Sequence, residues 1–209
     1  MPQKIVPLVC GEFYHIFNRG VDKRETFMDR EDYLRFYQTL HLFNTIEPVI
    51  NFDAAKARSK NGQTEKVLVE IKAYSILPNH YHMIIKQISE SGISEFMRRI
   101  STGYTTYFNQ KHERSGALFQ GKYKRVHIQS DEQYNYLFAY VNENHFVHNI
   151  RNDRQICHSS SIHYQGIARS KLIKTPADEK TYEFSANQTL AMQIYNERKR
   201  NKIEKVIFE

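Results

Sequence analysis

Residues 67–85 read VLVEIKAYSILPNHYHMII, and this stretch decides the fold. Val67–Ile76 is rich in β-branched and apolar side chains, and Tyr81–Ile85 is a second run of the same kind, which predicts two strands. The residues between them, Leu77-Pro78-Asn79-His80, place proline and asparagine at the central positions of a β-turn. The stretch therefore predicts a β-hairpin.

Regular patterns continue on both sides of this hairpin. Residues 12–19, EFYHIFNR, predict a strand that ends at Gly20. Apolar side chains recur at helical spacing over residues 29–43 and again over residues 93–108, which predicts two helices. Residues 117–128 predict a strand of mixed basic and apolar side chains. Ser130 and Gln133 have the spacing of a capping box, which predicts a helix reaching about Asn144.

The predicted order β-α-β-β-α-β-α indicates an α+β protein. A ferredoxin-like, split βαβ sheet with antiparallel strands and helices on one face satisfies this order most simply. Residues 44–66 lose the helical period and contain Pro48 and Asn61-Gly62, which predicts a long loop or surface insertion. At roughly 150 residues per domain, we expect one domain over residues 1–165. We expect residues 166–209 to be a C-terminal extension, partly helical or disordered, with a short helix over 189–202.

The composition excludes several classes of protein. No apolar run approaches the ~20 residues that a membrane span needs, and the first seven residues, MPQKIVP, are too short and interrupted for a signal peptide. Cys10 and Cys157 are the only cysteines, so the chain has neither a disulfide framework nor a four-cysteine zinc site. We therefore expect a cytoplasmic protein with no membrane partner.

The chain is basic, with 30 Lys and Arg against 23 Asp and Glu and a net charge of +7, which favours an anionic partner such as nucleic acid. Most of the excess lies between residues 98 and 128, where Glu113 is the single acid and the basic residues are Arg98, Arg99, Lys111, Arg114, Lys122, Lys124 and Arg125. The 14 tyrosines and 13 phenylalanines suit base stacking. The alternative is that the aromatic residues form the core and the charges are solvated.

His80-Tyr81-His82 is the sharpest local motif. Side chains alternate along a strand, so both imidazoles lie on one face while Tyr81 lies on the other. Two imidazoles at this spacing can chelate a divalent metal. The pattern is weak alone, because ten histidines often produce such a spacing by chance. The alternative is a pair of polar strand histidines with no special role.

Tyr140 and Asn144 lie four residues apart on the capped helix, so their side chains are neighbours. A phenol beside an amide oxygen would complete a site if the strand histidines lie opposite, and a tyrosine there is a candidate covalent nucleophile. The alternative is that Tyr140 merely borders the core.

Four ordered motifs carry a family resemblance: FYHIFNRG at 13–20, LPNHYH at 77–82, SGALFQGKYK at 115–124 and YVNEN at 140–144. Together they resemble the REP-associated tyrosine transposases, relatives of the single-tyrosine transposases in the HUH endonuclease superfamily. The resemblance covers roughly residues 8–165. It implies a ferredoxin-like fold and metal-dependent cleavage and rejoining of single-stranded or hairpin DNA through a 5′-phosphotyrosine intermediate.

The resemblance also implies roles for particular residues. Carried over by position, His80, His82 and Asn144 are the metal ligands and Tyr140 is the nucleophile. The cofactor is a divalent metal: Mg²⁺ prefers oxygen ligands, and Mn²⁺ accepts imidazole more readily. The residues expected on DNA are Arg19, Arg98, Arg99, Lys122, Lys124 and Arg125. We expect a monomer without a small-molecule substrate; the alternative is a dimer that completes its sites across chains.

One departure from the family pattern concerns the segment after the nucleophile. The family commonly has proline after the asparagine, whereas this chain continues Asn144-His145-Phe146-Val147-His148. His145 or Glu143 is therefore an alternative ligand, and Tyr136, one turn earlier, is an alternative nucleophile.

Two other functions compete with a transposase. A noncatalytic RRM-like module would bind nucleic acid on the same sheet by stacking and basic contacts. A zinc hydrolase would need three strong ligands and a base, of which only two ligands are evident in the sequence.

Overall fold

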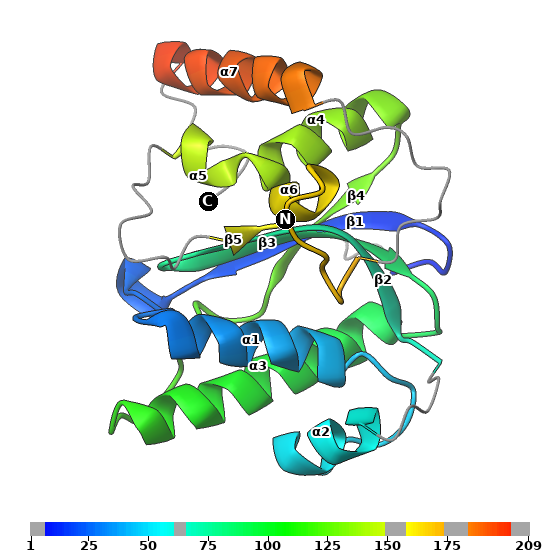
Figure 1. The fold of residues 1–209 in the computed structure, drawn as a ribbon, viewed down its shortest axis with the longest axis vertical. Coiled ribbons are helices and arrows are strands. Elements are labelled where there is room, and N and C mark those ends of the chain that lie inside the picture. The colour runs from blue at the N-terminus through cyan, green and yellow to red at the C-terminus, as the bar shows by residue number, and fades with distance from the viewer. Residues whose placement is uncertain (1–6, 61–65, 149–157, 174–183, 202–209) are drawn as a thin grey trace, which may run out of the picture.

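The computed structural model describes residues 7–60, 66–148, 158–173 and 184–201, and within the last helix the side chains of 186–197. Its centre is a five-stranded sheet in the order β4-β1-β3-β2-β5 (Figure 1). The strands are β1 (Phe13–Arg19), β2 (Val69–Leu77), β3 (His80–Gln87), β4 (Lys124–Ile128) and β5 (His158–Ser159). Every pairing of adjacent strands is antiparallel. The first four strands have the order of a split βαβ sheet, which confirms the predicted fold class.

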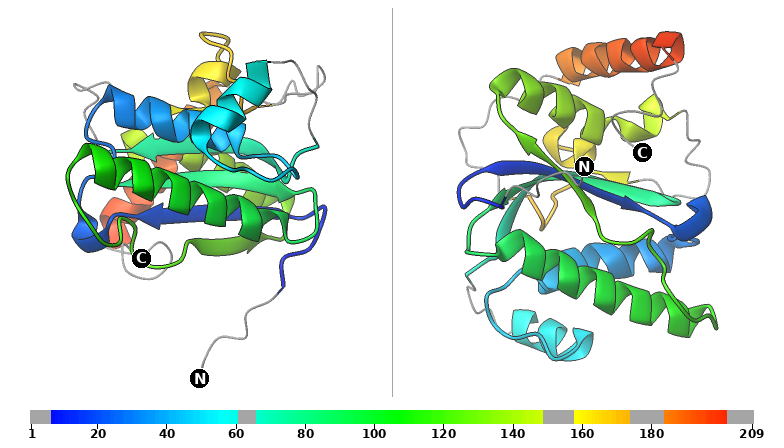
Figure 2. Two further views of the ribbon diagram at one scale, coloured as in Figure 1. Left: turned by 90° about the horizontal axis from the view of Figure 1, so that it is seen from below. Right: turned by 180° about the vertical axis from the view of Figure 1, so that it is seen from behind.

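Helices cover both faces of this sheet (Figures 1 and 2). The two crossover helices, α1 (Arg30–Leu42) and α3 (Gly92–Lys111), lie on one face, as predicted. The prediction that the helices lie on one face only is wrong, because the opposite face carries α4 (Asp131–Asn142), α5 (Asn144–Val147) and α7 (Phe184–Asn201). The sheet needs this second layer because strand residues such as Ala73 and Ile84 present an apolar surface there.

The core is accordingly divided into two clusters by the sheet. The larger cluster lies under α1 and α3 and contains Phe36, Tyr81 and Tyr104, all fully buried. The smaller one lies under α4 and α7 and contains Tyr140 and Ile194. Most of the tyrosine and phenylalanine side chains lie in these clusters or pack against them. For most of them, the alternative that aromatic residues form the core therefore holds.

Several boundaries differ from those predicted. The expected strand over residues 117–128 shortens to β4, because the positive φ of Gly121, 66°, belongs to a turn rather than a strand. The expected long loop over residues 44–66 contains a helix, α2 (Phe52–Lys60). This helix packs Phe52 and Ala55 against Phe43 in a small separate cluster.

The ends of the predicted helices also show local differences. Ser130 caps α4 by accepting a hydrogen bond from the Gln133 amide at 3.1 Å, but the Gln133 side chain reaches back to the Gln129 amide, at 2.9 Å, rather than to Ser130. The helix expected over 189–202 is confirmed and begins earlier, as α7. The short elements β5 and α6 (Ser161–Tyr164) were not predicted. None of the helices in the described part of the chain has the length and hydropathy of a bilayer span.

Candidate active site

The two strand histidines face α4. Tyr81 and Met83, which alternate with them along β3, are buried in the cluster under α1 and α3, so His80 and His82 lie on the other side of the sheet. Their ring centroids are 5.2 Å apart. The prediction that both imidazoles share one face is confirmed.

The hairpin turn fixes the orientation of His80. Its Nδ1 lies 2.6 Å from Oδ1 of Asn79, and an amide oxygen only accepts hydrogen bonds, so Nδ1 carries the proton. The neutral ring then has its lone pair at Nε2. The turn is itself tied to the segment after β1, because the Gly20 amide donates to the Asn79 carbonyl at 2.8 Å.

A third histidine, His15 of β1, completes a row with the other two. It is fully buried, and its Nε2 lies 2.9 Å from Nδ1 of His82. Burial lowers the pKa of His15 to about 3, so the ring is uncharged at neutral pH. His15 belongs to the motif FYHIFNRG, but the sequence did not predict a role for it. The signal that identifies it is the strand register, which pairs Phe17 with His82 and so places His15 on the histidine face.

Tyr140 reaches this row from α4. Its ring stands edge-on to His82, with centroids 5.4 Å apart, and to His15, at 6.2 Å. The phenol oxygen lies 3.2 Å from Nε2 of His148, a residue with no role assigned from the sequence. The structure thus brings the predicted nucleophile and the predicted metal-binding histidines together within one chain. Tyr136, the alternative nucleophile, lies one turn earlier and packs against the cluster under α4.

A buried polar clamp sets the position of the end of α4. The Ser160 hydroxyl donates to Oδ1 of Asn142 at 2.6 Å and accepts from the Tyr74 amide at 2.9 Å. The next serine, Ser161, donates to Oε1 of Glu143 at 2.9 Å. Ser160 therefore ties the last turn of α4, the helix that carries Tyr140, to β2, and Ser161 ties Glu143 to α6.

The side chain of Asn144 is buried and makes no hydrogen bond to the described residues. The helix breaks at Glu143, and Asn144 opens α5. Within the described part of the chain, neither its Oδ1 nor its Nδ2 has a hydrogen-bond partner, although buried amides are normally paired. Its carbonyl accepts from the His148 amide at 3.0 Å, and the His148 ring lies 5.1 Å from that of His80. Asn144 therefore lies on a turn that contacts the histidine pair.

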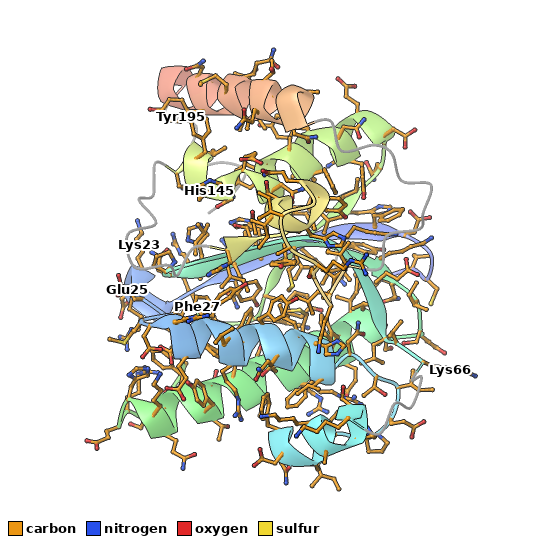
Figure 3. All side chains as sticks on the ribbon, viewed as in Figure 1. Lys23, Glu25, Phe27, Lys66, His145 and Tyr195 are labelled. Carbon is orange, nitrogen blue, oxygen red and sulfur yellow. The ribbon has the colours of Figure 1, made fainter. Side chains whose placement is uncertain are left out.

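The side chains of His80, His82 and Asn144 fit a divalent cation that accepts both nitrogen and oxygen ligands. Two imidazoles, one of them with its lone pair at Nε2, and an unsatisfied buried amide oxygen are a suitable set. No cluster of three or more His, Cys, Asp and Glu suited to a metal occurs among the described residues. Of the two alternative ligands, Glu143 accepts a hydrogen bond from the Ser161 hydroxyl. The other, His145, lies on α5, on the α7 side of the sheet (Figure 3).

Two of the basic residues predicted on DNA, Arg19 and Lys124, start from the histidine face of the sheet. Lys124 is paired with Phe17, and Arg19 with His80, so both side chains start from the histidine face. Arg19 is oriented by its Nε, which donates to Oε1 of Gln120 at 2.6 Å. Lys122 is exposed in the turn that leads into β4, and its Nζ lies 5.8 Å from the centroid of the Tyr123 ring, which packs on the α1 and α3 side.

The structure does not bring Arg98, Arg99 and Arg125 to that face. Arg98 and Arg99 lie on α3, across the sheet, and their guanidinium groups contact Glu95 at 2.7 and 2.6 Å. The hydrogen bond from Arg98, reinforced by Arg99, lowers the pKa of Glu95 to about 2. Arg125 is paired with Ile16, a core residue of the α1 and α3 side. Any DNA contact of these three residues would be separate from the histidine site.

Comparison with known proteins gives two findings. Residues 55–144 match the family model of the IS200-like transposases, which confirms, at the level of this wider family, the resemblance drawn from the sequence motifs. A solved structure of a REP-associated tyrosine transposase bound to a REP hairpin is similar with a TM-score of 0.49 and 14% identity, over 88% of this chain and 96% of that one. The search of curated proteins found no match.

Proposed function

We propose that this chain, whose residues 55–144 have the IS200-like transposase pattern, cleaves and rejoins single-stranded or hairpin DNA with Tyr140 as the nucleophile. The observation that carries the proposal is the placement of the Tyr140 ring against His82, at 5.4 Å between centroids. All residues of the site come from one chain, which suits action as a monomer.

The reaction is a transesterification. The Tyr140 oxygen attacks phosphorus, the bond from phosphorus to the 3′ oxygen breaks, and the 3′ oxygen leaves and takes up a proton. The product is a 5′-phosphotyrosine and a free 3′ hydroxyl. Rejoining reverses these steps with another 3′ hydroxyl and needs no ATP, because the covalent bond retains the energy of the phosphodiester.

His148 is positioned to receive the phenol proton. An unperturbed tyrosine has a pKa of about 10 and stays protonated at neutral pH, so a nearby acceptor assists attack. Nε2 of His148, 3.2 Å from the Tyr140 oxygen, is such an acceptor. The same hydrogen bond orients the phenol within its buried site.

His80, His82 and Asn144 would hold the divalent cation, Mg²⁺ or Mn²⁺. A bound cation of this kind neutralises a nonbridging phosphate oxygen and fixes the phosphate in place. Two of these ligands are already oriented by hydrogen bonds within the protein. The bond with Asn79 orients His80, and the bond with His15 orients His82.

The DNA strand would approach Arg19 and Lys124 on the histidine face, with Lys122 exposed in the turn that leads into β4. Such contacts neutralise phosphates and set the register of the strand without reading bases. The noncatalytic alternative is less well supported, because an RRM-type module stacks bases on an open sheet. Here α4 and α7 cover the corresponding face (Figure 2).

The test is covalent capture. Wild-type protein mixed with Mn²⁺ and a single-stranded hairpin oligonucleotide is expected to give a protein–DNA adduct that survives denaturing electrophoresis and disappears with EDTA. Tyr140→Phe should form no adduct and still bind DNA, and Tyr134→Phe, on the same helix, is the matched control. An undiminished adduct in Tyr140→Phe would refute the assignment, and Tyr136→Phe would then be examined.

A further inference from the structure

His15 is a buried titratable group to which the proposed chemistry gives no direct task. It comes from β1, the strand next to the one that carries the histidine pair, and it is fully buried. Its Nε2 and Nδ1 of His82 are 2.9 Å apart, and the planes of the two rings are nearly parallel, with an interplanar angle of 11° and centroids 5.1 Å apart. This is the geometry of a ring-to-ring hydrogen bond in which one nitrogen donates and the other accepts.

The direction of that bond decides what His82 can do. A neutral imidazole carries its proton on one nitrogen and its lone pair on the other. A histidine that binds a cation through Nε2 must therefore hold its proton on Nδ1, and such histidines usually donate this proton to an acceptor that fixes the ring. His80 has an acceptor of this kind in Asn79, at 2.6 Å. The group in the same place for His82 is Nε2 of His15.

We propose that His15 is a positioning residue that accepts the Nδ1 proton of His82 and so holds His82 in the tautomer that directs its Nε2 lone pair to the cation. The role given to this tautomer, metal binding, rests on the proposed function. The tautomer itself is a property of the metal-free protein and can be measured there. An uncharged His15 can accept the bond, whereas an imidazolium has only donors.

Packing around the pair supports this role. The ring of Phe17 stacks on both imidazoles, with centroids 4.9 Å from His15 and 5.4 Å from His82. Phe17 therefore provides contact without a hydrogen bond, while His15 provides the hydrogen bond. Variants of Phe17 and His15 therefore form a matched pair. A change at Phe17 alters only packing around His82, whereas a change at His15 removes its hydrogen bond.

The decisive measurement is the tautomer of His82 in the full-length, metal-free protein labelled with ¹⁵N. Long-range ¹H–¹⁵N spectra, recorded where the ring is neutral, report which nitrogen carries the proton. We expect Nδ1 to be protonated in the wild type and in Phe17→Leu. In His15→Phe, we expect the proton of His82 to shift toward Nε2. In His15→Gln, whose amide oxygen can accept a hydrogen bond, we expect the proton to remain on Nδ1. Wild-type His82 protonated on Nε2 would overturn the proposal, even if no variant folds.

A second readout is the affinity for Mn²⁺ in the absence of DNA, measured by electron paramagnetic resonance. Loss of a group that orients a metal ligand typically weakens binding about 10–100-fold, which we expect for His15→Phe, with recovery in His15→Gln. Unchanged affinity in a folded His15→Phe would contradict the proposal. Failure of the proposed function is a different result: the wild type would form no DNA adduct, whatever the tautomer of His82.

Discussion

Side-chain alternation along β3 places the residues of the site. His80 and His82 face α4 because the residues between and after them, Tyr81 and Met83, are taken up by the core on the other side. Each histidine then has its own hydrogen-bonding partner, Asn79 for the first and His15 for the second. The pair is therefore held by its neighbours rather than left as two mobile surface side chains.

Replacing His148 tests the route of the phenol proton. His148→Ala removes the group 3.2 Å from the Tyr140 oxygen, and we expect adduct formation to slow by about 10²–10⁴-fold, the usual contribution of a positioned acid or base. Single-turnover cleavage of a hairpin oligonucleotide gives the rate, and DNA affinity should be unchanged.

His127→Ala is the control for that experiment. His127 is a partly exposed histidine on β4 whose Nε2 contacts Glu12 at 3.0 Å, and its loss should not alter the rate. A wild-type rate in His148→Ala would mean that the hydrogen bond has no part in proton removal.

The sequence predicted that His80 and His82 share a face and that Tyr140 and Asn144 are neighbours, because alternation and helical spacing are local properties; their candidate roles came from the family resemblance. The sequence did not predict His15 and His148. His15 becomes relevant only when β1 pairs with β3 in one particular register, and His148 only when the chain turns after Glu143 into α5. Both depend on contacts between segments distant in sequence or on an irregular turn, which periodicity does not encode.

Among the elements, α4 connects the folded core to the chemistry. Ser130 caps its first turn, and Ser160 ties its last turn to β2. Its start was predictable from the capping pattern, whereas the clamp at its end was not, because Ser160 follows residues for which no element was predicted.

The α3 helix carries an ion-pair network that we expect to be structural. Arg99 donates to the carbonyls of Thr45 and Glu47 at 2.8 and 2.9 Å while it contacts Glu95. This links α3 to the segment that follows α1. The same residues looked like a DNA-binding patch in the sequence, because sequence proximity to Lys122 and Lys124 does not show on which side of the sheet a charge lies.

The pH dependence of stability tests this interpretation. The pKa of Glu95 is lowered to about 2, so its stabilising effect is present above the unfolded value of about 4.3 and is lost as the pH falls through the folded value. We expect Glu95→Gln to cost about 1 kcal/mol at pH 7, an estimate reduced because the pairs are partly exposed. The cost should disappear toward pH 2.

Urea denaturation at neutral and acidic pH measures this difference in the free energy of unfolding. Glu90→Gln, at an exposed position just before α3, is the control and should show little effect at either pH. A cost for Glu95→Gln that persists at the lowest pH would show that the charge of Glu95 is not its source.

In the whole molecule, the sheet separates two surfaces that the sequence does not distinguish. One carries the histidine row with Lys124 and Arg19 at its end, and the other carries α1 and α3 (Figure 1). The fold class and the strand order were predictable from the sequence of elements. The second helical layer was not, because an amphipathic helix does not reveal which face of a sheet it covers.

Salt dependence of DNA binding distinguishes the two surfaces. For single strands, the slope of log affinity against log salt changes by about 0.7 for each phosphate contact. We expect Lys124→Ala to reduce the slope by about this amount and Arg98→Ala to leave it unchanged, as measured by fluorescence anisotropy with a labelled hairpin. An equal reduction in both variants would place DNA on the α3 surface as well.

The identity of the residue that becomes bonded to DNA is the most direct test of the account. Trypsin is expected to release residues 126–151 as one peptide, which contains Tyr134, Tyr136 and Tyr140. After capture on a hairpin oligonucleotide with Mn²⁺ and nuclease trimming, tandem mass spectrometry of this peptide locates the nucleotide. We predict the added mass on Tyr140; a nucleotide on Tyr136 or Tyr134, or a captured complex in which this peptide is unmodified, would contradict the account.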